Sequence, residues 1–158
     1  MNQQETIEIR AACPEDYDGL YELWCRTSGF GIRSVDDSRE NIGRFLLRNP
    51  GISAVAVCGG HIIGDILCGH DGRTGSFYHV CVDQDWRRHG ICHQLVDFCS
   101  RALQKEGIST ATLIAFKKNE VGNAFWQNAG WTLREDINRY EYSLNRDNLV
   151  EFVPDTNG

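Results

Sequence analysis

Residues 87–90 (Arg-Arg-His-Gly) carry phosphate-binding chemistry and stand between an apolar segment and an amphipathic one. The apolar segment, residues 78–82, has the composition of a buried strand, and the apolar spacing after Gly90 predicts a helix. A helix N-terminus has unpaired backbone N–H groups and a partial positive charge, which together bind anions. Gly90 permits close approach of the backbone, and the two arginines add charge-assisted hydrogen bonds. The segment therefore predicts a site for a pyrophosphate.

The bulk composition indicates one soluble globular domain. The chain has 158 residues, of which 41% are hydrophobic and 24% charged, enough for a full core. No apolar run approaches the roughly 20 residues of a membrane span, and the N-terminus has no signal-peptide pattern. We therefore expect a cytoplasmic protein without membrane contact. The net charge of −6 disfavours a nucleic-acid partner and suits a cationic substrate such as an amine.

The seven cysteines include no Cys-x-x-Cys pair, so neither a zinc site nor a disulfide framework is expected. Most are expected to be small buried side chains that the cytosol keeps reduced. Cys92 is the exception, because a place beside arginines at a helix N-terminus lowers the pKa of a thiol. We therefore predict no metal and keep Cys92 as a candidate reactive thiol.

The elements that must position the phosphate turn alternate between strands and helices. In chain order, the sequence predicts a strand at 7–11, helices at 14–28 and 34–48, strands at 52–58, 61–68 and 76–83, a helix at 90–106, a strand at 111–116, a helix at 121–128, and final strands near 131–133 and 140–144. Antiparallel hairpins precede a β-α-β unit, so the expected class is α/β (α+β), with a mixed, mostly antiparallel central sheet flanked by helices. We expect a single domain at residues 1–145 and a polar, fraying tail at 146–158.

The phosphate turn and this element order together resemble the GNAT superfamily of N-acetyltransferases. The family signature Gln/Arg-x-x-Gly-x-Gly/Ala is matched by residues 87–92 (Arg-Arg-His-Gly-Ile-Cys). A second signature, Asn-x-x-Ala followed by an aromatic residue and a terminal Gly-Phe, is matched by residues 119–122 (Asn-Glu-Val-Gly), Trp126, Gly130 and Trp131. The loop at residues 69–75 is similar to that of small bacterial members whose substrate is unassigned.

The resemblance implies acetyl-CoA as the co-substrate. Its pyrophosphate would be held by the turn, at Arg87, Arg88, His89, Gly90, Ile91 and Cys92. Its pantetheine arm would pair with the backbone of the central strand at Val80, Cys81 and Val82, usually where a bulge exposes these groups. Asn119 matches a family position that hydrogen-bonds the arm.

Several residues depart from the family pattern. Cys92 replaces a Gly or Ala; it is small enough to permit binding, and the alternative is that its thiol crowds the phosphate and lowers the affinity. Arg88 replaces a frequent Gly and either adds a compensating charge or is a solvated cation. His89 either donates to a phosphate or faces solvent. Trp126 stands where a tyrosine general acid is frequent; an indole has no proton to give near neutral pH, so we expect packing against the sheet.

The usual base of the family is also missing, because Ser76 stands where a Glu or His is frequent. Tyr78 shares the strand face of Ser76 by alternation and is a candidate to orient the amine or protonate the thiolate; the alternative is a half-buried core tyrosine. His79 is expected on the other face as a hydrogen-bonded core residue, unless a bulge exchanges the two faces. Asp71, in a loop expected to border the amine site, is a second catalytic candidate, although a turn-forming Asp is commoner.

Three activities are compatible with these residues. The first is acetyl transfer from acetyl-CoA to a primary amine of a small molecule or peptide in a ternary complex, with the oxyanion held by a backbone N–H near Val80. The second is a catalytically weak domain that senses acyl-CoA. The third uses Cys92 as a nucleophile, although the pyrophosphate should cover that thiol. A homodimer through the last strands is compatible with the sequence, and the amine stays unassigned.

Overall fold

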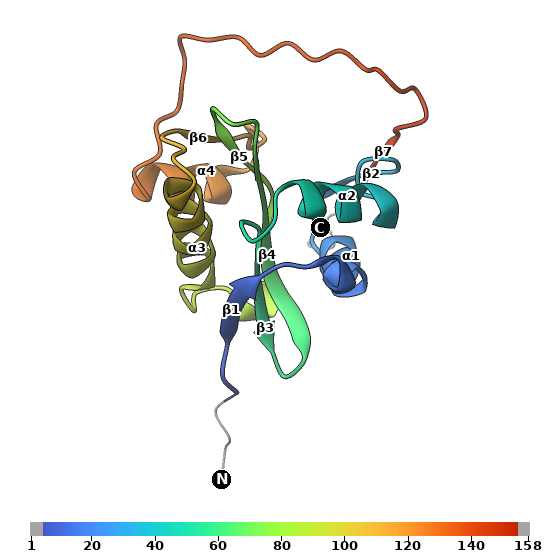
Figure 1. The fold of residues 1–158 in the computed structure, drawn as a ribbon, viewed down its shortest axis with the longest axis vertical. Helices are drawn as coiled ribbons and strands as arrows, with labels where there is room; N and C mark the ends of the chain where they lie inside the picture. The colour runs from blue at the N-terminus through green and yellow to red at the C-terminus, as the bar shows by residue number, and fades with distance from the viewer. Residues whose placement is uncertain (1–4, 155–158) are drawn as a thin grey trace.

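The structure, a computed structural model, describes residues 5–154 (Figure 1). Its elements are β1 (Glu8–Ala11), η1 (Pro14–Asp16), α1 (Tyr17–Cys25), β2 (Gly31–Arg33), α2 (Arg39–Arg48), β3 (Ala54–Cys58), β4 (His61–His70), β5 (Gly75–Val82), η2 (Gln84–Trp86), α3 (Ile91–Lys105), β6 (Ala111–Leu113), α4 (Glu120–Asn128) and β7 (Val150–Phe152). The predicted order therefore holds from β1 to α4, apart from the additional strand β2.

The central sheet has the strand order β1-β3-β4-β5-β6. Its pairs are antiparallel except for β5 and β6, which are parallel. The β3–β4 hairpin turns at Gly59 and Gly60, whose φ angles of 56° and 78° are strained for other residues. The predicted mixed, mostly antiparallel sheet is confirmed.

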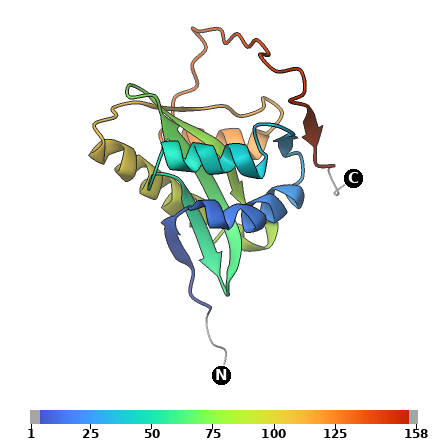
Figure 2. The same cartoon turned by 45° about the vertical axis from the view of Figure 1, so that its right-hand side comes forward.

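Helices cover both faces of this sheet. Figure 1 shows α3 and α4 on one face, and Figure 2 shows α1 and α2 lying across the other. The apolar residues of α3 recur every fourth position, which places them on one side of the helix against the sheet. They are buried and are Ile91, Leu95, Cys99 and Leu103. Full burial of such side chains contributes about 1.5–3 kcal/mol each, so this face fixes the helix on the sheet.

β5 separates from β6 after a short contact. The two strands pair only at residues 75–77, whereas β5 continues to Val82 and β6 ends at Leu113. A β-bulge follows at once, because Tyr78 is opposite Leu67 while Cys81 is opposite Asp65. Two β5 residues, His79 and Val80, thus face a single β4 residue. Beyond Phe77, the edge of β5 is open.

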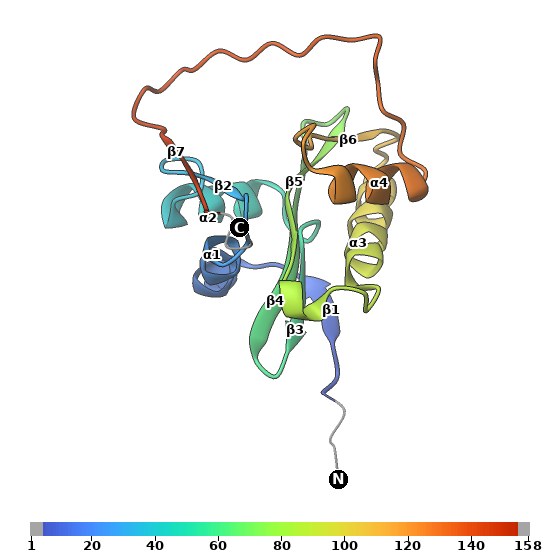
Figure 3. The same ribbon diagram turned by 180° about the vertical axis from the view of Figure 1, so that it is seen from behind.

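The two predicted final strands are wrong. Residues 131–149 form no strand and arch from α4 to the side of α1 and α2, as the orange-to-red segment of Figures 1 and 3 shows. Tyr140, Tyr142 and Leu144 alternate as a strand would, but they are 89%, 88% and 93% exposed. An alternating pattern produces a strand only where a neighbouring strand and a buried face receive it, and this chain provides neither there.

The fraying expected of the tail is also wrong for residues 149–153. β7 pairs antiparallel with β2, and backbone bonds from Ser34 N to Leu149 O and from Val153 N to Phe30 O extend the contact. The domain boundary at residue 145 stays a prediction, and residues 155–158 of the tail lie outside the described residues. Neither β2 nor β7 was predicted, because each has three residues and depends on the other for its hydrogen bonds.

Candidate active site

The N-terminus of α3 has no side-chain cap, in contrast with α2 and α4, which Ser38 and Asn119 cap. Its N-cap, Gly90, has a φ of 73°, a conformation that glycine adopts without strain. Without a cap, the first-turn N–H groups and the helix dipole are left for an external acceptor. These groups are free at the position where the sequence predicts an anion site, and the binding of a pyrophosphate there stays a prediction.

The cations of the turn lie beside these N–H groups. Arg87 and Arg88 are exposed, and neither forms an ion pair with any residue in the described range 5–154. Arg88 has a φ of 68°, a costly conformation for a residue with a Cβ. His89 Nδ1 lies 3.0 Å from the carbonyl oxygens of both Trp86 and Arg87. The His89 ring therefore braces the turn, and its contact with a phosphate stays a prediction.

The chemistry expected of Cys92 is contradicted. The side chain is partly buried, and burial raises the pKa of its thiol to about 11 instead of lowering it. Desolvation of the thiolate thus outweighs the nearby helix terminus and arginines. Cys92 is protonated near neutral pH, which removes the basis for a nucleophilic role.

The central strand presents an open backbone edge next to this turn. Asp83 N donates to Ile63 O at 2.8 Å, so strand alternation directs the backbone groups of Val82 away from β4, towards the open edge. The side chains of Val80 and Val82 pack on the α3 side. Cys81 is buried towards α1, with its Sγ 2.9 Å from Thr27 Oγ1, and burial raises its pKa to about 12. A ligand strand or an extended arm can pair with this edge.

Asn119 stands at the start of α4. Its Oδ1 accepts a hydrogen bond from Gly122 N at 3.0 Å and so caps the helix. Its Nδ2 donates to no protein group within residues 5–154. The amide nitrogen is therefore available for the predicted bond to the co-substrate arm. Trp126, in the same helix, is buried against Phe77 and Trp131, as predicted.

The β5 bulge places two polar side chains on the same face. Phe77 packs on the α3 side, but both Tyr78 and His79 point towards α1 and α2. Tyr78 is 49% exposed and lies edge-on to Phe45. The expectation that His79 faces away from Tyr78 is wrong, because the extra residue of the bulge reverses the alternation. The catalytic role of Tyr78 stays a prediction.

His79 is held by a buried carboxylate that sequence reasoning missed. Its Nε2 lies 2.5 Å from Asp37 Oδ1, and its ring lies 4.7 Å from the rings of both Trp24 and Phe30. The other oxygen of Asp37 accepts from Arg33 N at 2.7 Å. Asp37 belongs to the turn before α2, and nothing in the sequence pairs it with a residue 42 positions away.

A second buried carboxyl lies nearby on β4. Asp65 is fully buried; Trp24 Nε1 donates to its Oδ1 at 3.2 Å, and its Oδ2 has no partner in the described part of the chain. Burial raises the pKa of Asp65 well above its usual range, and the charge of Asp37 raises it further, against the lowering effect of the Trp24 bond. Burial therefore favours the protonated, neutral form of Asp65.

Asp71 lies in the exposed turn between β4 and β5. Its Oδ1 accepts from the backbone N–H groups of Arg73 and Thr74, each at 2.8 Å, and these bonds lower its pKa. The structure therefore gives Asp71 the turn-forming role that was its alternative. Its proposed catalytic role stays a prediction.

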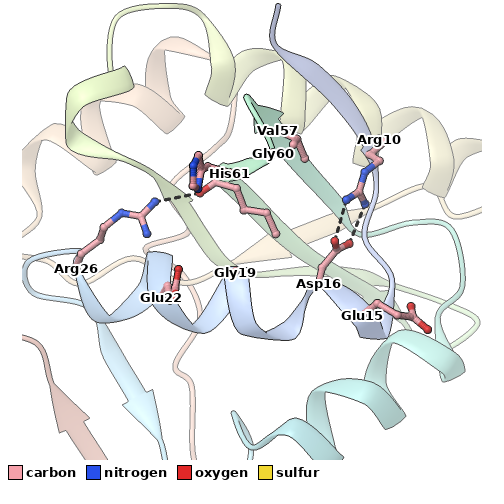
Figure 4. A pocket seen from close by; sticks show the side chains of 10 residues that line it. Arg10, Glu15, Asp16, Gly19, Glu22, Arg26, Val57, Gly60 and His61 are labelled. Carbon is pink, nitrogen blue, oxygen red and sulfur yellow. Dashed lines mark hydrogen bonds and ion pairs between the residues drawn. The ribbon is translucent and has the colours of Figure 1, made fainter. Parts of the chain in front are cut away.

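A shallow cavity of about 220 Å³ lies between α1 and the β3–β4 hairpin (Figure 4). Both of its arginines are already paired: Arg10 forms two bonds of 2.8 Å with Asp16, and Arg26 bonds to Asp83 and to Ile62 O. None of the residues of the phosphate turn lines it. Within residues 5–154 there is no cluster of metal-binding side chains and no helix long and apolar enough to cross a membrane.

An uncapped anion turn at a helix N-terminus, beside a central strand with a bulge and an open edge, defines a class of nucleotide-cofactor acyltransferases. A family model described as an acetyltransferase (GNAT) domain matches residues 49–133. An acetyltransferase of Pectobacterium atrosepticum is 30% identical over 114 residues, which cover 72% of this chain and 79% of that protein. An acetyltransferase of Sodalis glossinidius is 25% identical over 131 residues, which cover 83% of this chain and 91% of that protein.

Solved structures share the fold. A PaiA N-acetyltransferase of Thermoplasma acidophilum in complex with coenzyme A has a TM-score of 0.72 and 18% identity over 92% of this chain and 96% of its own. Aminoglycoside N-acetyltransferase AAC(6')-Iy in complex with CoA has a TM-score of 0.69 and 17% identity, over 90% of this chain and 98% of its own. This chain belongs to the GNAT acetyltransferase family, as its sequence predicted.

The residues of this chain fit acetyl-CoA, which is the predicted co-substrate and the one that family membership supports. Exposed arginines and uncapped N–H groups of α3 suit its pyrophosphate, and the open edge of β5 suits an arm that carries amide groups. Cys92, in the first turn of α3, is small and partly buried, and the crowding of the pyrophosphate by its thiol stays a prediction.

Proposed function

We propose that this protein transfers the acetyl group of acetyl-CoA to a primary amine while both substrates are bound. The observation that carries the proposal is the open β5 edge, which begins at Tyr78 and runs towards the uncapped N-terminus of α3. These two features give a thioester a fixed path from its phosphates to the bulge. Holding both reactants in this way replaces an encounter in solution by a reaction within one complex.

The reaction needs no covalent enzyme intermediate. The neutral amine attacks the thioester carbon, the carbon–sulfur bond breaks, and the thiolate takes a proton. The developing oxyanion is stabilised by a backbone N–H near Val80, in the bulge. Cys92 supports this direct route, because a thiol with a pKa of about 11 is a poor nucleophile near neutral pH.

The amine belongs to a small molecule or a peptide. One structural neighbour is described in complex with a bisubstrate analogue of CoA and acetylneamine, and another in complex with sisomicin. These ligands are amines, which supports the proposed class of acceptor. The net charge of −6 supports a cationic one.

Calorimetric titration with acetyl-CoA, followed by release of CoA thiol with a panel of primary amines, tests the proposal. We expect one-to-one binding and sequential steady-state kinetics. Binding without turnover on any amine would favour the alternative, a catalytically weak acyl-CoA sensor, which the buried Trp126 also allows. An acetylated enzyme that forms without amine would contradict the ternary complex.

We also propose a homodimer in which residues 139–144 of each copy add to the β6 edge of the other. The segment has the alternation of a strand and no partner within the described chain, and β6 is an edge strand. Ile114 and Phe116, which follow β6, are 63% and 51% exposed, so an apolar surface is present where the added strand would lie.

A further inference from the structure

His79 combines three properties that a buried structural histidine does not need. Its φ of 49° is strained for a residue with a Cβ, it lies in a bulge, and it belongs to the open edge of the central strand. Strain of this kind persists only where the surrounding structure imposes it. Bulges of this kind are frequent next to active sites, where they re-aim a side chain.

The bond to Asp37 determines which ring nitrogen can accept a proton. When Nε2 donates to Asp37 Oδ1, the neutral ring has its lone pair on Nδ1. Nδ1 has no bond to any protein group in the described chain, and the side chain of His79 is 18% exposed. The ring is therefore oriented at one nitrogen and open at the other.

Asp37 is itself fixed from three directions. Its carboxylate accepts from Arg33 N, its backbone N donates to Arg33 O at 3.0 Å, and its backbone O accepts from Tyr17 Oη at 2.7 Å. The side chain of Asp37 is 5% exposed, so water does not compete for the imidazole. Trp24 and Phe30 flank the ring and leave it little freedom to rotate.

We propose that His79, oriented by Asp37, is the general base that removes the proton of the attacking amine. This proposal rests on the acetyl transfer proposed above. The nitrogen–carbon bond forms as the carbon–sulfur bond breaks, and the amine proton passes to His79 Nδ1. The imidazolium is stabilised by Asp37 and then returns the proton to the leaving thiolate or to water. Tyr78, on the same face, is placed to assist at the thiolate.

The test compares two substitutions at residue 79 with one at a matched histidine. Asn tolerates the positive φ and keeps a polar group, so His79→Asn removes the base at little cost in folding. Gly needs no strain there, so His79→Gly leaves a ring-sized space between Trp24 and Phe30 for added imidazole. His61→Asn is the control, because His61 is exposed at the β3–β4 hairpin.

Turnover of the wild type with the amine panel is measured first. Its absence would contradict the proposed acetyl transfer, whereas the role of His79 is tested by the variants of an active protein. In an active protein, we expect His79→Asn to lower kcat by about 10²–10⁴-fold. The dissociation constant of acetyl-CoA should stay within about threefold, since a base does not hold the co-substrate. Imidazole should restore turnover of His79→Gly in proportion to its free-base concentration, and His61→Asn should match the wild type.

Two results would overturn the proposal. One is full kcat in His79→Asn. The other is a folded His79→Gly that binds acetyl-CoA but shows no response to imidazole, because a structural role is not replaced by a free base. Asp37→Asn gives a further readout: loss of kcat with unchanged acetyl-CoA binding is expected if Asp37 positions the ring, and unchanged kcat would contradict it.

Discussion

At the residue scale, the phosphate turn carries exposed arginines that form no ion pair within the described chain. Arg88 keeps a strained φ of 68° and forms no ion pair in the described chain, which a purely solvated cation does not require. Burial decides the chemistry of other residues: it raises the pKa of Cys92, Cys81 and Asp65. Exposure and burial therefore separate the groups predicted to bind the ligand from those that pack in the core.

Removal of the Arg88 guanidinium should weaken acetyl-CoA binding. We expect Arg88→Ala to raise the dissociation constant about tenfold at low salt, the effect of losing one charge-assisted hydrogen bond, and to flatten its salt dependence. Arg101→Ala is the matched control, since Arg101 pairs with Asp97 on the same helix, away from its N-terminus. Calorimetry measures the acetyl-CoA affinity of both variants. Equal affinities would show that Arg88 is a solvated cation that does not contact the co-substrate.

Asp65 should make stability fall as pH rises. Below about pH 3 the carboxyl is largely protonated in the folded and the unfolded chain, so it costs little. Above that pH the unfolded chain releases the proton while burial keeps it bound in the folded chain, so the free energy of unfolding decreases up to the raised pKa. Asp65→Asn removes this dependence.

Thermal unfolding at several pH values tests this expectation. The melting temperature of Asp65→Asn should exceed that of the wild type by several degrees at pH 8 and approach it below about pH 3. Asp136→Asn is the control, because Asp136 is exposed and bonds to Arg134, which lowers its pKa to about 2. A constant difference between Asp65→Asn and wild type across this range would refute the assignment.

At the element scale, the site depends on how closely α3 packs on β5. A Cβ at Gly75 would lie 2.6 Å from Leu103 Cδ1, so this glycine lets the last turns of α3 approach the strand. The same packing sets the position of the α3 N-terminus at the other end of the helix. The contact between β5 and α3 therefore couples the core to the anion turn.

Gly75→Ala should lower the free energy of unfolding by about 1–3 kcal/mol, since the added methyl has no space. Gly43→Ala is the matched control: a Cβ there meets nothing within 4 Å, and the position is inside α2, so about 0.5–1 kcal/mol of added stability is expected. Urea denaturation compares the two. Equal free energies of unfolding would show that the Leu103 side chain moves aside for the added methyl without loss of stability.

At the scale of the whole molecule, the arch of residues 131–149 joins the two sides of the sheet. It is anchored at one end by Trp131, which packs on Phe77, and at the other by Leu149, which bonds to Ser34, and residues 132–147 between them are exposed. It carries some of the most exposed apolar side chains of the described chain, among them Tyr140, Tyr142 and Leu144. An exposed segment with the alternating pattern of a strand can pair with a free sheet edge. This arrangement is the one expected of a single copy taken from the proposed homodimer, in which each chain adds a strand to the β6 edge of the other.

Light scattering tests the homodimer. We expect the wild type to have twice the chain mass of 17.9 kDa, and a variant with Tyr140→Lys and Tyr142→Lys to have that mass once while it still binds acetyl-CoA. Leu47→Lys is the control, because Leu47 is also exposed, at 73%, but lies on α2. A monomeric wild type would contradict the exchange.

The local sequence determined the family, the order of elements from β1 to α4 and the phosphate turn. Each depends on short-range patterns: apolar periodicity, Gly59 and Gly60 at the hairpin, and Gly90 before a helix. Only the tertiary structure placed His79 against Asp37, buried Cys92 and Asp65, and paired β7 with β2. A bulge reverses strand alternation without any local signal, and burial shifts a pKa through neighbours that are distant in sequence.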